Sequence, residues 1–119
     1  PGVWNEQFKG MFGIEVPDDT QGCLQDIHWS MGGFGYFPTY SLGNLNSAQL
    51  YDSAQKALGP RLGDLQNGNY HGLLGWLRTN VHQFGKQYPP AELMQNATGK
   101  PTQPDYHWSY LKDRFSSMG

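Results

Sequence analysis

The sequence is poor in the features that stabilise secreted and membrane proteins. It holds a single cysteine, Cys23, so no disulfide can form within the chain and no paired-cysteine metal motif is present. A lone thiol fits a reducing compartment, and we interpret Cys23 as a small packed hydrophobic residue. No apolar run approaches the roughly 20 residues that span a bilayer, and no signal-peptide pattern occurs. The sequence therefore predicts no membrane partner.

Charge is also scarce. The 8 basic and 10 acidic residues give a net charge of −2, without any run of Lys or Arg. This argues against nucleic acid or an anionic membrane surface as the main partner. Charged residues make up only 15% of the chain while aromatic residues reach 14%, which indicates a surface partly covered by other polypeptide. An ordinary soluble domain rich in aromatic residues fits the same composition.

The four histidines lack the spacing of a metal site. A zinc hydrolase needs two imidazoles one helical turn apart, a third ligand and a carboxylate that activates water. None of the histidines begins an HExxH motif, and His71 and His82 would meet only loosely on one helix face. We therefore expect no metal site in this chain and no peptidase activity from the chain alone.

Strand-like alternation is absent, and helical periodicity takes its place. Trp4, Phe8, Met11 and Phe12 fall on one face of a helix that Gly13 ends. Residues 1–119 are predicted to form a single all-α domain, an array of about six short helices with one glycine-rich loop. Further helices are expected over residues 19–29, 38–58, 70–84 and 89–97, with a short one over 61–66 and a last one from about residue 104.

The helix over residues 19–29 carries the most specific expectations. Asp18 has capping-box spacing to Gln21 and would start it. Within that helix Gln25 would share a face with His28, while Asp26 would point elsewhere as a cap or salt-bridge partner. The alternative is that Gln25 and Asp26 orient His28 or brace the turn; a carboxylate of Asp26 that accepts from the imidazole would fix its tautomer, but this needs a non-helical backbone.

Two longer helices carry expectations about burial and binding. The first half of the helix over 38–58 has little polar face, so we expect it to be buried on more than one side; its apolar residues are Tyr40, Leu42 and Leu45. In the helix over 70–84, Gly75 would permit a close helix contact. Arg78 and His82, one turn apart, would address one anion, or else form a solvated face with Arg78 in an ion pair.

Residues 22–43, GCLQDIHWSMGGFGYFPTYSLG, are the centre of the sequence. One imidazole, His28, is followed by a flexible glycine turn and by two phenols, Tyr36 and Tyr40. Glycine lets a backbone take positive φ and lets another chain approach closely. A histidine and two tyrosines beside such a turn are suited to donate hydrogen bonds to a developing oxyanion. Core aromatic residues with satisfied polar tips are the alternative.

The residues GCLQDIHW match the Gly-x-x-Gln-Asp-x-His-Trp signature of the thermostable metallocarboxypeptidase family, the HExxH zinc carboxypeptidases. Four further segments are similar to that family, in order and with compatible spacing: VWNEQFKGMFGIEVP, FGYFPTYSLGNL, GWLRTNVHQFG and PAELMQNATGKP with YLKDRF. The chain is far shorter than the family's enzymes and resembles only their C-terminal part. The HExxH motif of the family would lie upstream of the matched part.

The resemblance implies roles for residues of the signature and the glycine turn. His28 is expected to hydrogen-bond the tetrahedral intermediate or a substrate carbonyl, and Tyr40 is favoured over Tyr36 as the oxyanion donor. The other phenol, Tyr36, would bind the terminal carboxylate of the substrate. Gln25, Gly33 and Gly35 are assigned to substrate binding, and Asp26, Trp29, Arg78 and His82 to supporting roles.

The resemblance also implies a C-terminal part of a metal-dependent carboxypeptidase that forms the wall of a cleft. Zinc or cobalt is expected in the full-length enzyme and none in this chain; family members are typically cytoplasmic homodimers acting on peptides. The expected partners are therefore peptide substrates, the missing N-terminal catalytic region and a second subunit. The alternative is a non-catalytic helical module that binds peptide or protein through aromatic residues around Trp29, Phe34 and Phe37.

Overall fold

The first helix, α1 (Gly2–Phe12), forms and ends as its apolar spacing predicts. Gly13 takes φ 69°, a left-handed conformation that favours glycine, and its N–H donates back to a carbonyl of the last turn at 2.8 Å. Trp4 stacks on Phe8 with ring centroids 4.8 Å apart, and Phe8 contacts Phe12 at 4.7 Å. The apolar face of α1 is therefore a row of aromatic rings.

The α-helix predicted over residues 19–29 is wrong. Only a 3₁₀ turn, η1 (Cys23–Gln25), forms there. Gly22 before it has φ −113° and ψ −121°, and Asp26 after it is extended at φ −89° and ψ 125°. Neither residue has helical torsion angles, so the turn cannot propagate in either direction.

Bonds between side chains and backbone replace the helix. Asp18 accepts the Gln21 N–H at 2.8 Å, which is the predicted capping contact, but it closes a turn and no α-helix follows. Asp26 in turn accepts the His28 N–H at 2.8 Å. Aspartate side chains that bond the backbone in this way compete with helix formation, so the segment folds as consecutive turns.

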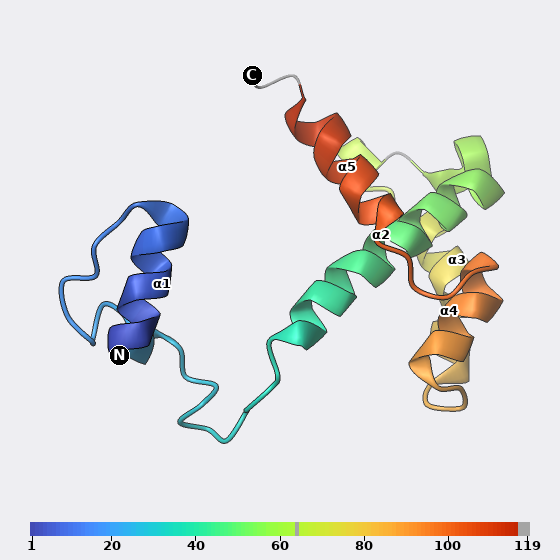
Figure 1. Ribbon diagram of the computed structural model, residues 1–119. Helices are drawn as coiled ribbons and strands as arrows, with labels where there is room; N and C mark the ends of the chain where they lie inside the picture. Colours follow the sequence, from blue (N-terminus) through green and yellow to red (C-terminus); the bar gives the residue numbers. More distant parts are fainter. Residues whose placement is uncertain (64, 117–119) are drawn as a thin grey trace. The chain divides into compact units, whose positions relative to one another are not determined.

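This segment packs back onto α1, which lies beside it in Figure 1. A Cβ added at the buried Gly22 would lie 2.5 Å from Val16 Cγ1 and 3.4 Å from Asn5 Oδ1. Only glycine leaves room for that approach. The glycine that opens the sequence signature is therefore needed for packing.

The computed structural model describes residues 1–63 and 65–116, which contain helices and turns and no strand. This confirms the all-α prediction. Contacts between Cα atoms group the chain into two units, residues 1–37 and residues 38–119. That the whole chain is one domain stays a prediction. None of the helices in the described range has the length and apolar character of a membrane span.

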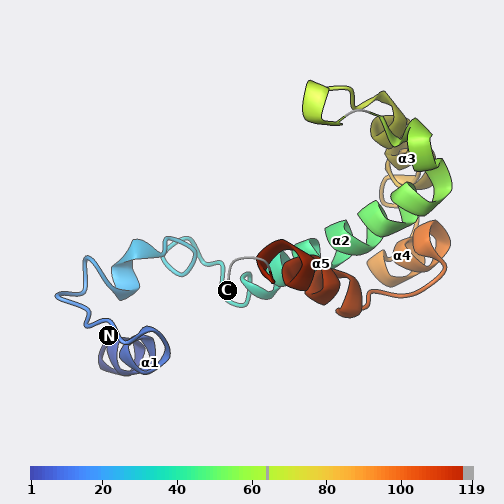
Figure 2. The ribbon, with the colours of Figure 1, turned by 90° about the horizontal axis from the view of Figure 1, so that it is seen from above.

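The second unit is built on one long helix. Pro38 begins α2 (Pro38–Leu58), as predicted from its missing N–H. The three other α-helices of the unit each contact it, as Figures 1 and 2 show. They are α3 (His71–Asn80), α4 (Pro90–Thr98) and α5 (Asp105–Phe115). The predicted starts at Pro90 and near Pro104 are confirmed.

Two helical predictions in this unit need correction. The short helix over 61–66 consists instead of two 3₁₀ turns, η2 (Gly59–Leu62) and η3 (Leu65–Asn67), and residue 64 lies outside the described residues. The helix over 70–84 ends early because Val81 leaves the helical region at φ −131° and ψ −62°. A separate 3₁₀ turn, η4 (His82–Phe84), follows.

Burial in the second unit is smaller than predicted. The first half of α2 was expected to be covered on more than one side, yet Tyr40 and Leu42 are half exposed. The buried apolar side chains among the described residues are Ala54 and Met94. The described part of the second unit therefore leaves the start of α2 partly uncovered.

A buried amide joins α2 to the connection between α4 and α5. Gln49 is fully buried, and its Nε2 donates to Thr98 Oγ1 at 2.7 Å and to the Lys100 and Pro101 carbonyls at 3.1 Å. Its Oε1 accepts the Gln103 N–H at 2.8 Å. All polar atoms of this side chain are therefore satisfied inside the unit.

The close glycine approach in α3 occurs at Gly72 and not at the predicted Gly75. A Cβ added at Gly72 would lie 1.9 Å from the Arg61 carbonyl oxygen and 2.6 Å from that of Leu62. A Cβ at Gly75 would meet no atom within 4 Å. The sequence pattern marked the right helix, but the contact is one turn closer to its start.

Replacing Gln49 by Leu should destabilise the protein by about 2–3 kcal/mol, because the part-buried hydrogen bonds of this amide to the Gln103 N–H and to the Lys100 and Pro101 carbonyls would be lost. Chemical denaturation of the purified variant measures this loss. Gln55→Leu, an exposed position on the same helix, is the matched control and should change stability by less than about 0.5 kcal/mol. Equal effects at both positions would contradict the role given to Gln49.

The two glycines of α3 form a second matched pair. Gly72→Ala should destabilise by about 1–3 kcal/mol, since its methyl group would overlap backbone oxygens. Gly75→Ala should stabilise by up to about 1 kcal/mol, because alanine is the better helix former and the space is open. Amide hydrogen exchange of α3 reports both changes locally. Two changes of the same sign would show that the Gly72 contact is not formed.

Candidate functional site

The site is organised by an Asp-x-His pair in the turn that follows η1. Asp26 Oδ1 accepts the backbone N–H of His28 at 2.8 Å. The same carboxylate faces the imidazole, with Oδ1 3.1 Å and Oδ2 3.2 Å from Nδ1. The helical prediction, in which Asp26 points away from His28, is therefore wrong, and the alternative on a non-helical backbone, in which Asp26 faces the imidazole, is the one that forms. In an extended backbone at Asp26, the two side chains fall on the same side.

Two aromatic rings lie against the imidazole. The ring of Tyr36 is stacked on that of His28 with centroids 5.4 Å apart and an interplanar angle of 21°. The Phe37 ring is tilted against the imidazole at 4.9 Å. The His28 side chain keeps only 27% of its surface exposed. Its orientation is thus set by one carboxylate and two rings from a span of twelve residues.

The glycine turn brings these rings back to the histidine. The Gly33 N–H donates to the His28 carbonyl at 2.6 Å, and the Tyr36 N–H donates to the Gly33 carbonyl at 3.3 Å. A Cβ at Gly33 would lie 3.0 Å from the His28 carbonyl oxygen. Gly32 and Gly35 have φ of 80° and 74°, where a side chain would be strained. The predicted loop over residues 30–37 is confirmed.

A hollow of about 410 Å³ lies beside this pair. Its walls combine signature residues with aromatic rings: Trp4, Phe8, Gln21, Gly22, Gln25, Asp26 and Phe37. The sequence assigned Gln25 to this region but missed Trp4 and Phe8, which were read only as a helix face. Gln25 also braces the turn, since its Nε2 donates to the Thr20 carbonyl at 2.6 Å.

The remaining predicted site residues are placed as follows. Trp29 is 57% exposed and stacks on Phe34 with centroids 6.2 Å apart. Tyr40 belongs to the first turn of α2 and is 51% exposed. Arg78 is exposed in α3, and His82 is exposed beyond the end of that helix. The predicted one-turn relation of Arg78 and His82 on a continuous helix is therefore wrong.

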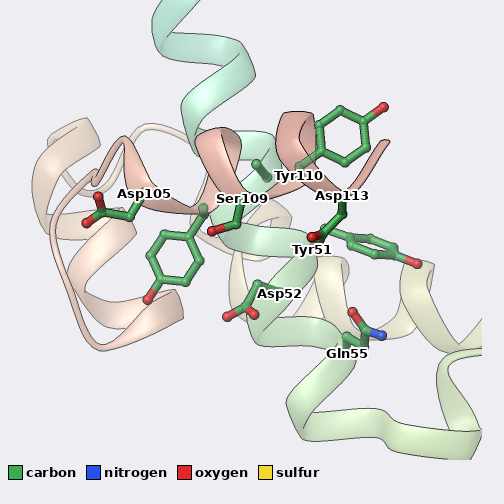
Figure 3. A pocket seen from close by; sticks show the side chains of 9 residues that line it. Tyr51, Asp52, Gln55, Asp105, Ser109, Tyr110 and Asp113 are labelled. Atoms are coloured by element: carbon green, nitrogen blue, oxygen red, sulfur yellow. The ribbon is translucent and has the colours of Figure 1, made fainter. Parts of the chain in front are cut away.

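A second hollow, of about 400 Å³, lies between α2 and α5. Figure 3 shows Asp52 and Gln55 from α2 opposite Ser109 and Asp113 from α5. Lys56 donates to Asp52 Oδ2 at 2.7 Å, and this hydrogen bond raises the pKa of the ammonium group. None of the residues predicted as functional lines this hollow.

The described residues do not fit a metal ion. Within 1–63 and 65–116, no three His, Cys, Asp or Glu side chains gather in a group that could hold one. The Asp26–His28 pair supplies two such groups, and the imidazole nitrogen nearest to the carboxylate is already engaged. The arrangement provides an imidazole of fixed orientation, and phenol groups lie near it in the sequence.

The chain is similar to known peptidases over nearly all of its length. The family model of the Carboxypeptidase Taq (M32) metallopeptidases matches residues 1–115. Thermostable carboxypeptidase 1 of Pyrococcus furiosus is 36% identical over 115 residues, covering 97% of this chain and 23% of the relative. Carboxypeptidase 1 of Bacillus subtilis is 36% identical over 118 residues, covering 99% and 24%.

Solved structures give the same result. Metallocarboxypeptidase 1 of Trypanosoma cruzi matches with a TM-score of 0.88 at 39% identity, over 98% of this chain and 25% of its own. The chain thus spans about a quarter of the length of the relatives it matches, and it corresponds to their C-terminal portion. The chain belongs to the Carboxypeptidase Taq (M32) metallopeptidase family.

Proposed function

We propose that this chain is the C-terminal part of a metal-dependent carboxypeptidase that removes C-terminal residues from peptides. It would supply one wall of the substrate cleft, while the metal would be held by residues outside the chain. The observation that carries the proposal is the placement of His28, the signature histidine, between Asp26, Tyr36 and Phe37. A histidine held so firmly at the surface of a turn suits contact with a reacting group.

The proposed roles follow the chemistry of each group. His28 would contact the tetrahedral intermediate or the substrate carbonyl through its Nε2. Tyr40 would donate to the oxyanion and Tyr36 to the terminal carboxylate of the peptide. Gln25, Gly33 and Gly35 would line the substrate path, with Trp29, Arg78 and His82 in supporting positions.

The metal of the full-length enzyme is proposed to be zinc or cobalt. When bound, such an ion polarises the scissile carbonyl and activates water. The unpaired Cys23 is compatible with a cytoplasmic location. A homodimer acting on peptides is the proposed form of the enzyme.

The exposed apolar surface supports the proposal that further polypeptide covers this chain. Side chains such as Met31 and Phe34, each 76% exposed, are unusual on a protein surface in such number. The relatives have about three times as much chain outside the matched part as within it. We propose that the remaining catalytic region covers part of this apolar surface.

In the full-length enzyme, His28→Gln and Tyr40→Phe should each lower kcat by about 100-fold or more, the usual loss of one transition-state donor. Steady-state kinetics on a short peptide measures this. Tyr40→Phe should not lower the unfolding midpoint appreciably, because the Tyr40 hydroxyl belongs to a half-exposed side chain. Tyr70→Phe, at another exposed tyrosine, is the control and should retain normal kcat.

The same variants separate the competing functions. A purely structural role for these aromatic residues would lower stability, with activity falling only in proportion to unfolding. A non-catalytic peptide-binding module would show loss of binding and no hydrolysis in any variant. Normal kcat in both His28→Gln and Tyr40→Phe would refute the proposed roles.

The isolated 119-residue chain should self-associate, because its exposed aromatic and aliphatic side chains would lack their partner surface. Sedimentation velocity over a range of concentrations measures this association. Co-expression with the remaining catalytic region should suppress it. A clean monomer at high concentration would count against a covering partner.

A further inference from the structure

Asp26 makes more contacts with His28 than its bond to the backbone needs. Oδ1 accepts the His28 N–H at 2.8 Å, and this bond alone closes the turn. Both carboxylate oxygens also lie within 3.2 Å of Nδ1. The contacts with Nδ1 restrain the imidazole ring, and they are not needed to close the turn.

We propose that Asp26 is a positioning residue for His28: its carboxylate holds the ring through Nδ1, so that Nε2 is the nitrogen presented to the peptide substrate. This inference rests on the proposed function, in which His28 contacts the reacting group. Asp26 itself touches neither the substrate nor the reacting atoms in this scheme.

The chemistry of the carboxylate sets the proton position. An ionised carboxylate can only accept hydrogen bonds, so the bond to Nδ1 requires a proton on that nitrogen. When the ring is also protonated at Nε2, Asp26 is its counter-ion at 3.1 Å. In either state the contact with the substrate is left to Nε2.

The rings complete the restraint. Tyr36 stacks at 5.4 Å and Phe37 lies at 4.9 Å, so rotation of the imidazole about its bonds is hindered by its neighbours. Asp26 then selects which edge of the ring faces its carboxylate. A reacting group positioned to a fraction of an ångström reacts faster than one that is free to turn.

Asp18 is a matched aspartate in the same unit. Its Oδ1 accepts the Gln21 N–H at 2.8 Å, as Asp26 does with His28, and its other oxygen accepts from the Gln21 side-chain amide at 3.2 Å. Asparagine forms such turns as well as aspartate does. Substitution by Asn therefore keeps the backbone bond at both positions and removes the carboxylate at both.

The test compares Asp26→Asn with Asp18→Asn in the full-length enzyme. In Asp26→Asn an amide NH₂ can replace the acceptor 3.2 Å from Nδ1, so two donors would oppose each other. We expect kcat to fall about 10- to 100-fold, the value of one charged hydrogen bond, with KM within about threefold. Asp18→Asn should leave kcat, KM and the unfolding midpoint unchanged.

The ¹⁵N NMR spectrum of the histidine ring provides a test that does not depend on activity. With [¹⁵N]histidine labelling, the His28 signals are identified by their loss in His28→Gln. Asp26→Asn should move the proton from Nδ1 to Nε2, while Asp18→Asn should leave the ring spectrum unchanged. An unchanged His28 spectrum in Asp26→Asn, or unchanged kcat, would overturn the inference.

A double variant separates this inference from the proposed function. Asp26→Asn should cause no further loss of kcat in the His28→Gln background, because the carboxylate acts through the ring. Independent losses in the double variant would overturn the positioning role. If His28→Gln alone keeps normal kcat, the proposed function fails; if only Asp26→Asn does, the positioning role alone fails.

Discussion

The second unit depends on the buried amide of Gln49. With Ala54 and Met94 as its buried apolar side chains, the described part of this unit has little hydrophobic core to fix α4 and α5 against α2. Gln49 compensates by bonding Thr98 at the end of α4 and three groups of the connection between α4 and α5. Because the Gln49 side chain is fully buried, these hydrogen bonds are stronger and their loss is costlier than in water. The hydrogen bonds of Gln49 therefore stabilise the unit as much as the burial of apolar side chains does.

The first unit follows a different physical rule. Its turns are closed by short side chains and glycines, and aromatic rings pack along α1 and around His28 and Trp29. Asp26 both ends η1 and faces the imidazole. One carboxylate therefore links the local backbone course to the chemistry of His28. Asp26 thus acts on both the backbone and the side chain of the signature histidine.

Glycine and proline made much of the fold predictable. Gly13, Pro38 and Gly59-Pro60 mark boundaries that the structure confirms. The segment over 19–29 could not be predicted from its apolar spacing, because Asp26 offers the backbone a competing hydrogen bond. Burial of the first half of α2 was also misjudged, since burial depends on surfaces that lie elsewhere.

The candidate site was likewise predictable from the sequence only in part. The stretch over residues 22–43 pointed to His28, Tyr36 and the glycine turn, and the structure brings the imidazole and the phenol ring together. The contact between Asp26 and His28 was expected only for a non-helical backbone, because two residues at this spacing face apart in a helix and together in a turn.

The contacts of the His28 ring have a consequence for the order of folding. Its contacts with Asp26, Tyr36 and Phe37 join residues no more than nine positions apart in the chain. Closing such short loops costs little chain entropy and takes well under a microsecond for an unstructured peptide. The imidazole can therefore find its neighbours while the nascent polypeptide is still searching for long-range partners. These contacts of the histidine are local in sequence, so their contact order is low and they can form before the larger protein assembles.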